Sequence, residues 1–137
     1  GNWQVGTCAT PVQAAGVLED ASMVKVARAD SGRALYFSRT RIPWASEATK
    51  PIQRTGSFTF LRHLGIYAYE QSALEQWASL APSRLEQIES LEQLRPLEAD
   101  LRIGVAIVEG AHEGVDTLLD AARVEQQLSH LTHSTLV

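Results

Sequence analysis

The sequence lacks several features that would define a protein class at once. It has one cysteine, Cys8, in 137 residues, which excludes an internal disulfide and a cluster of thiolate metal ligands. No apolar run approaches the roughly 18–20 residues that span a bilayer, and residues 1–4 lack the basic and apolar layout of a signal peptide. We therefore expect one soluble, cytoplasmic domain or part of one, with no membrane partner.

Several catalytic motifs are also missing. No Gly-rich phosphate loop follows a strand, and Ser38 lacks the Gly-x-Ser-x-Gly turn of a hydrolase nucleophile. The histidines at 112, 130 and 133 fit no zinc-ligand spacing. The sequence thus gives no support for covalent catalysis or for structural zinc.

The charge is distributed unevenly along the chain. The net charge of -4 argues against a nucleic-acid partner. Residues 1–69 nevertheless hold eight Lys and Arg against four Asp and Glu, whereas residues 70–137 hold four against twelve. This pattern is typical of solvated faces of opposite sign, and it also suits an anionic ligand held by arginines.

Hydrophobic periodicity predicts strands in the first half of the chain and mostly helices in the second. Alternation predicts strands at 4–12, 23–28, 34–38 and 58–69, and Ile and Val content predicts another at 101–108. A short helical or irregular segment is expected at 12–20 and a loop at 43–57. Helices are expected at 72–81, 83–99 and 117–128, the first two opened by capping boxes at Ser72 and Ser83. This order predicts part of an α/β sandwich with a mixed sheet.

The strand at 58–69 carries the first group of candidate site residues. Its even positions are mostly apolar and are expected to pack, leaving His63 and Tyr67 on the opposite face, roughly 13 Å apart. Gly65 between them would let a ligand lie on the backbone. The alternative is that both side chains are half-buried sheet residues bonded to backbone groups.

Two further groups of polar residues lie in the second half. Glu92 and Gln93 supply a carboxylate and an amide that suit a hydroxyl-rich ligand, although Glu92 is equally well spaced for an ordinary pair with Arg95 three residues on. Asp116 precedes the predicted last helix, where it would act as an N-cap or as one oxygen ligand of Mg²⁺.

Several strings, taken together and in order, resemble the 3-deoxy-D-manno-octulosonate (KDO) cytidylyltransferases. These strings are Ala34–Arg39 (ALYFSR), Ile42–Trp44 (IPW), Leu61–Tyr69 (LRHLGIYAY), Pro82–Glu86 (PSRLE), Glu89–Arg95 (ESLEQLR) and Gly114–Thr117 (GVDT). The resemblance implies the C-terminal portion of a three-layer, Rossmann-like nucleotide-diphospho-sugar-transferase fold with a mixed sheet.

The resemblance also implies a function and a set of site residues. The enzymes transfer CMP from CTP to KDO, releasing pyrophosphate, in lipopolysaccharide precursor synthesis. Position by position, it implies that His63, Tyr67, Glu92 and Gln93 contact the sugar acid, that Arg39 suits its carboxylate, and that Asp116 binds Mg²⁺.

The sequence departs from the family in one large respect. The family's N-terminal half, with the CTP-binding loop and the other Mg²⁺ carboxylate, is expected to be absent from this chain. Residues 1–137 are therefore interpreted as the sugar-acid-binding and dimer-forming half, inactive alone, with CTP and Mg²⁺ bound only when the other half is present. A non-catalytic oligomeric protein derived from this fold, and a cytidylyltransferase half for another sugar acid, are the alternatives.

Overall fold

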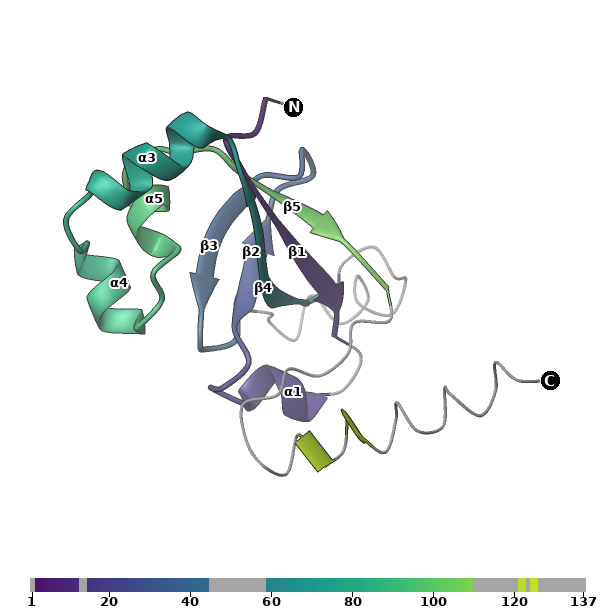
Figure 1. Ribbon diagram of the computed structural model, residues 1–137. Coiled ribbons are helices and arrows are strands. Elements are labelled where there is room, and N and C mark those ends of the chain that lie inside the picture. Colours follow the sequence, from purple (N-terminus) through teal and green to yellow (C-terminus); the bar gives the residue numbers. More distant parts are fainter. Residues whose placement is uncertain (1, 13–14, 45–58, 110–120, 123, 126–137) are drawn as a thin grey trace.

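The computed structural model describes residues 2–12, 15–44, 59–109, 121–122 and 124–125, and the account below is confined to them. Figure 1 shows a twisted sheet with a group of helices on one side. In chain order the elements are β1 (Val5–Pro11), α1 (Ala15–Glu19), β2 (Lys25–Arg28), β3 (Ala34–Ser38), β4 (Leu61–Tyr69), α3 (Gln71–Ser79), α4 (Arg84–Glu89), α5 (Leu94–Glu98) and β5 (Ile103–Ile107).

The sheet has five strands in the order β3-β2-β4-β1-β5. β1 pairs in parallel with β5 and antiparallel with β4, while β2 pairs antiparallel with β3 and β4. The α/β fold with a mixed sheet, expected from the order of the strands and helices, is confirmed. The predicted hairpin is also confirmed, with Gly32 in its turn at a φ of 95°.

The core lies between the sheet and the helices α3 to α5. Alternate residues of β1 (Val5 and Ala9) and of β5 (Ile103 and Val105) are buried, as the period of two in a strand requires. They belong to one apolar cluster with Trp77 of α3, Leu91 in the turn before α5 and Leu94 at the start of α5. The other buried members of the cluster are Val26, Ala34, Phe37, Leu61, Ala73 and Leu101.

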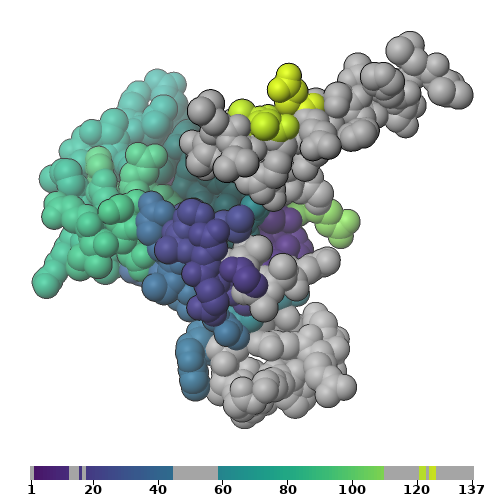
Figure 2. All heavy atoms as spheres, turned by 90° about the horizontal axis from the view of Figure 1, so that it is seen from below, coloured from purple at the N-terminus to yellow at the C-terminus, as the bar shows by residue number. Residues whose placement is uncertain are grey.

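A buried lysine closes the corner between α1, β2 and β3. Lys25 is 0% exposed, in a strand whose residues alternate between apolar and polar. Its Nζ donates to the carbonyl oxygens of Asp20 at 2.8 Å, of Met23 at 2.6 Å, and of Arg39. These three acceptors replace water around the ammonium group, while burial lowers the pKa of Lys25. Figure 2 shows the indigo and blue atoms of this corner directly beside the teal and green helices.

The predicted faces of β4 are wrong for much of the strand, although Phe60, an even position just before it, is buried as expected. Ile66, at an even position, is 64% exposed, whereas Leu61, at an odd position, is buried. Tyr67 packs against Trp77 of α3, and His63 packs against Tyr67 and Phe37. Alternation separates two faces but does not say which one meets the helices, and here the aromatic face has more surface to bury. β4 begins at Leu61, and Phe58 lies outside the described residues.

The predicted helix at 83–99 is two helices. The capping box at Ser83 is confirmed, with Glu86 N 3.3 Å from Ser83 Oγ and Ser83 N 2.9 Å from Glu86 Oε2. Ser90 then turns left-handed, with a φ of 53°, and ends α4. Pro96 lies in the first turn of α5, where a missing N–H leaves no helical bond unmade. Inside a continuous helix the same proline would remove a bond.

The other predicted capping box is wrong. α3 begins at Gln71, with Glu70 as its N-cap and no side-chain capping bond, so Ser72 is already inside the helix. Gln71 Nε2 donates instead to Glu75 Oε1 at 2.9 Å. Of the predicted helix at 117–128, residues 121–122 and 124–125 are described, and they are helical. In the described part of the chain, no helix is both long and apolar enough to cross a membrane.

Candidate functional site

A bulge in β4 brings two of the predicted site residues together. Tyr67 pairs with Thr7 and His63 pairs with Ala9, so a step of two residues on β1 faces a step of four on β4. The two rings are consequently 5.4 Å apart between their centroids. The separation of roughly 13 Å expected for an unbroken strand is therefore wrong, because that distance assumes an uninterrupted ladder.

Gly65 makes this bulge possible. It has a φ of 65°, in the left-handed region that costs a side chain about 1–2 kcal/mol. A Cβ built at this position would meet no atom within 4 Å, so the requirement for glycine comes from the backbone conformation and not from lack of space. The strand pattern alone did not reveal this role.

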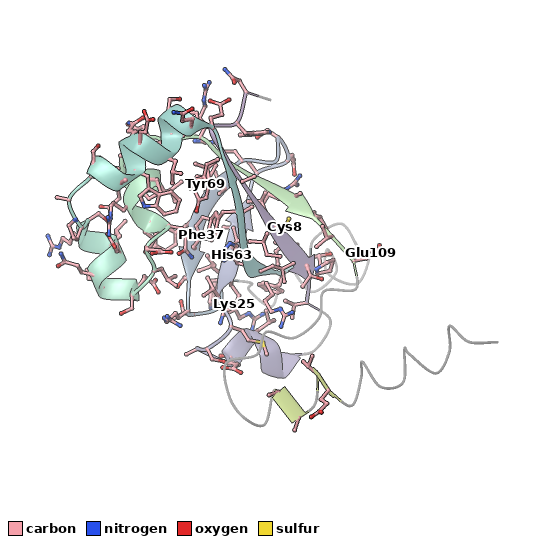
Figure 3. All side chains as sticks on the ribbon, viewed as in Figure 1. Cys8, Lys25, Phe37, His63, Tyr69 and Glu109 are labelled. Atoms are coloured by element: carbon pink, nitrogen blue, oxygen red, sulfur yellow. The ribbon has the colours of Figure 1, made fainter. Side chains whose placement is uncertain are left out.

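His63 is fixed in place and kept neutral by its surroundings. Its Nε2 lies 2.8 Å from Thr7 Oγ1, and its ring meets Phe37 edge-on with centroids 4.9 Å apart. Burial lowers the pKa of His63 to about 4, so the imidazole is uncharged at neutral pH. Figure 3 shows Phe37, His63 and Tyr69 between the strands and the helical layer.

Tyr67 lies in a cluster of aromatic rings and has an unusual hydroxyl group. Tyr69 stacks on it at 5.8 Å, and Trp77 meets it edge-on at 5.9 Å. The Tyr67 hydroxyl is buried and has no hydrogen-bond partner among the residues that the structure describes. Burial, followed by the nearby Tyr69 and the charge of Glu92, raises the pKa of Tyr67. A buried polar atom without a partner is costly and often marks a place where a ligand binds.

Glu92 and Gln93 lie in the turn between α4 and α5. The buried leucines on either side, Leu91 and Leu94, anchor this turn in the core. Gln93 is 5% exposed, while Glu92 is exposed and its negative charge contributes to the raised pKa values of Tyr67 and Tyr69. The turn thus sets a carboxylate within electrostatic reach of the two tyrosines.

Arg95 does not pair with Glu92, contrary to the alternative that the spacing allowed. Its guanidinium group donates two hydrogen bonds to the Glu86 carboxylate. Nε lies 2.8 Å from Oε2, and Nη2 donates to Oε1. Glu86 belongs to the capping box of α4, so Arg95 ties α4 to α5. The carboxylate of Glu92 is therefore left free of this partner.

Arg39 occupies a supporting position next to the site. Its Nε donates to the Glu89 carbonyl at 3.0 Å, Nη1 to the Ala21 carbonyl at 3.1 Å, and Nη2 to the Ser90 carbonyl at 3.2 Å. In return, the Glu89 carboxylate accepts the Arg39 backbone N–H at 3.1 Å. Arg39 thus holds the end of α4, two residues before Glu92.

Asp116, the predicted Mg²⁺ ligand, lies outside the described residues. Within the described ranges, no group of three or more His, Cys, Asp or Glu side chains could hold a metal ion. The described residues do not by themselves form a magnesium site.

Sequence reasoning missed Thr7, Tyr69 and Trp77. Thr7 is 4% exposed and stands at an inward position of β1, between Val5 and Ala9. A polar residue at an inward strand position requires a hydrogen-bond partner, and this requirement was the signal available in the sequence.

Comparison with known proteins identifies the family. The profile of the cytidylyltransferases matches residues 1–107. The chain belongs to the cytidylyltransferase family. Its similarity to a solved cytidylyltransferase, CMP:2-keto-3-deoxy-manno-octonic acid synthetase in complex with CTP, has a TM-score of 0.83 at 35% identity and covers 94% of this chain and 50% of the other.

Curated relatives give the same result. The 3-deoxy-manno-octulosonate cytidylyltransferase of Xanthomonas campestris pv. campestris (strain 8004) is 45% identical over 130 residues, or 92% of this chain and 52% of the relative. The protein of the same name from Acidobacterium capsulatum is 50% identical over 105 residues, or 77% of this chain and 40% of the relative. This cytidylyltransferase chain spans about half the length of the curated relatives it matches.

Proposed function

We propose that this chain carries the KDO-binding part of a KDO cytidylyltransferase. The observation that supports it best is the β4 bulge, which sets His63 beside Tyr67 and within electrostatic reach of Glu92. The buried Tyr67 hydroxyl has no partner within the described part of the chain. Such a hydroxyl becomes satisfied when a polar ligand fills the site.

The chemistry of these residues suits a sugar acid. The neutral imidazole and the tyrosine hydroxyl can exchange hydrogen bonds with sugar hydroxyls, while the Glu92 carboxylate accepts and the Gln93 amide both donates and accepts. Arg39 would reach the sugar carboxylate only with the guanidinium donors not already bound to the Glu89, Ser90 and Ala21 carbonyls. We rank it as the weakest of the five proposed contacts.

Transfer of CMP also requires CTP and a metal ion. The resemblance assigns the CTP site to residues that are not part of this sequence, and Asp116 to Mg²⁺. A bound Mg²⁺ would neutralise phosphate charge, and a carboxylate is a ligand type that it prefers. One carboxylate is too few, so the isolated chain should release no pyrophosphate from CTP and KDO. We also propose that the protein assembles as a homodimer or higher homo-oligomer in the cytoplasm.

Calorimetric titration with KDO tests the binding site. Wild-type chain should bind KDO, and Tyr67→Phe should weaken binding about tenfold, since it removes one buried hydrogen bond. The matched control is Tyr36→Phe, the same change on β3. The Tyr36 hydroxyl lies 3.5 Å from Glu89 Oε1, and its removal should alter the affinity for KDO less than twofold. Equal affinities of Tyr67→Phe and wild type, or no binding by wild type, would contradict the proposal.

The same titrations distinguish the two alternatives, which are a different sugar-acid substrate and a non-catalytic oligomeric protein. A sialic acid or an 8-amino analogue that binds more tightly than KDO would indicate a different sugar-acid substrate. Light scattering that finds a tight oligomer, together with no heat from any sugar acid, would support a non-catalytic interaction protein.

A further inference from the structure

Thr7 connects the two ends of the β4 bulge through one oxygen atom. Its Oγ1 lies 2.7 Å from the Ile66 carbonyl oxygen and 2.8 Å from His63 Nε2. Ile66 falls in the break of the β1–β4 register, so no residue of β1 is paired with it. Thr7 is 4% exposed, and its hydroxyl group supplies the hydrogen bond to the Ile66 carbonyl in place of a paired residue of β1.

The protons of this arrangement can be assigned from the chemistry of the three groups. A threonine hydroxyl has one proton to donate, and a carbonyl oxygen can only accept. The hydroxyl proton therefore points to Ile66, and the contact with His63 must use a proton carried by Nε2. Because burial keeps the imidazole neutral, its other nitrogen, Nδ1, carries no proton and is an acceptor.

The opposite assignment fails at the carbonyl. If Thr7 donated to His63 Nε2, two oxygen lone pairs would face each other at 2.7 Å and the Ile66 carbonyl would lose its bond from Thr7. The bulge thus selects one of the two neutral tautomers of His63.

We propose that Thr7 is a positioning residue that holds His63 in the Nε2–H tautomer, leaving Nδ1 to accept a hydrogen bond from a hydroxyl of the sugar acid. This inference rests on the proposed function for the identity of the ligand, but not for the tautomer. The Thr7 methyl group adds rigidity, since two substituents on Cβ restrict the rotation of the side chain.

Two substitutions separate the hydroxyl from the shape of the side chain. Thr7→Val keeps the shape and removes both hydrogen bonds, whereas Thr7→Ser keeps the hydroxyl. Nitrogen NMR of the imidazole ring, with the His63 signals assigned by their loss in His63→Gln, should find Nε2 protonated and Nδ1 unprotonated in wild type and Thr7→Ser. Thr7→Val should give a mixture of tautomers.

Affinity for KDO, measured by calorimetry, gives the second readout. We expect about a tenfold loss in Thr7→Val and less than a threefold loss in Thr7→Ser. Protonation at Nδ1 in the wild type would overturn the inference, and so would wild-type tautomer and affinity in Thr7→Val. If Thr7→Val does not fold, the tautomer in wild type and Thr7→Ser decides. A wild type that keeps the Nε2–H tautomer but does not bind KDO would contradict the proposed function and support the tautomer assignment alone.

Discussion

The two sides of β1 differ in regularity, and they differ in what they contribute. On one side, five successive residues pair with β5 without a break, from Val5 opposite Ile103 to Ala9 opposite Ile107. On the other side, the pairing with β4 is interrupted between Thr7 and Ala9. The regular side supplies apolar core residues, while the interrupted side supplies His63, Tyr67 and the buried hydroxyl groups.

This difference shows how one strand can serve stability and chemistry together. An unbroken ladder satisfies its own backbone groups and leaves side chains free to fill the core. A bulge leaves a carbonyl unpaired and redirects the neighbouring side chains, which is useful only where something else binds the exposed groups. In this chain the rigid β1–β5 pair supports the interrupted pair.

The largest effect on stability should come from the regular side. Ile103 is 0% exposed, and Ile103→Ala should lower the free energy of unfolding by about 3 kcal/mol through lost burial and a cavity. Ile107→Ala, on the same strand at a residue that is 49% exposed, is the matched control and should cost less than about 1 kcal/mol. Urea denaturation measures both. Similar losses in the two variants would show that the core does not depend on this side.

A pH dependence should come from the interrupted side. The pKa of His63 is about 4 in the folded chain, against 6.5 for a histidine side chain free in water, so the unfolded chain binds more protons between these values. The stability is fully present above pH 6.5 and is lost as the pH falls, by up to about 3 kcal/mol near pH 4, since one pKa unit is 1.36 kcal/mol. Urea denaturation of wild type and His63→Gln over this range isolates the effect. Parallel curves for the two proteins would contradict it.

The smallest effect should come from the backbone of the bulge. Gly65→Ala should lower the free energy of unfolding by about 1–2 kcal/mol, because alanine resists the left-handed conformation while its methyl group meets no other atom. Gly65→Asn should cost less, since asparagine tolerates that conformation better. Thermal denaturation measures both variants. A neutral Gly65→Ala would mean that the bulge is not fixed by this residue.

The sequence predicted the elements of the fold better than their details. Alternation located β1, the hairpin and β4, because each strand has one face that must be buried. The bulge was not predicted, because the alternation of apolar residues does not show how many residues of a strand are left unpaired. A glycine inside a strand is nevertheless a typical sign of a bulge. Pro96 similarly indicated that the predicted helix at 83–99 is interrupted. The evenly spaced leucines favoured one continuous helix instead.

The sequence supplied candidate residues for the site but not their arrangement in space. The resemblance supplied His63, Tyr67, Glu92 and Gln93. The structure puts the rings of His63 and Tyr67 in contact and sets Glu92 within electrostatic reach of Tyr67. Local pattern could not reveal that Arg39 binds backbone carbonyls or that Thr7 contacts His63 across 56 positions of the chain. Such contacts depend on how distant strands pair, which is a property of the whole fold.

The aromatic cluster gives the chain an optical probe of its own. Trp77 is 8% exposed and lies edge-on to Tyr67 and Tyr69, at 5.9 and 5.4 Å between ring centroids. An indole in such contact reports by its fluorescence on any molecule that settles against those tyrosines. The other two tryptophans are Trp3, which is half-buried, and Trp44, which is 82% exposed. A single-tryptophan chain would then show ligand binding by its emission alone, without a label.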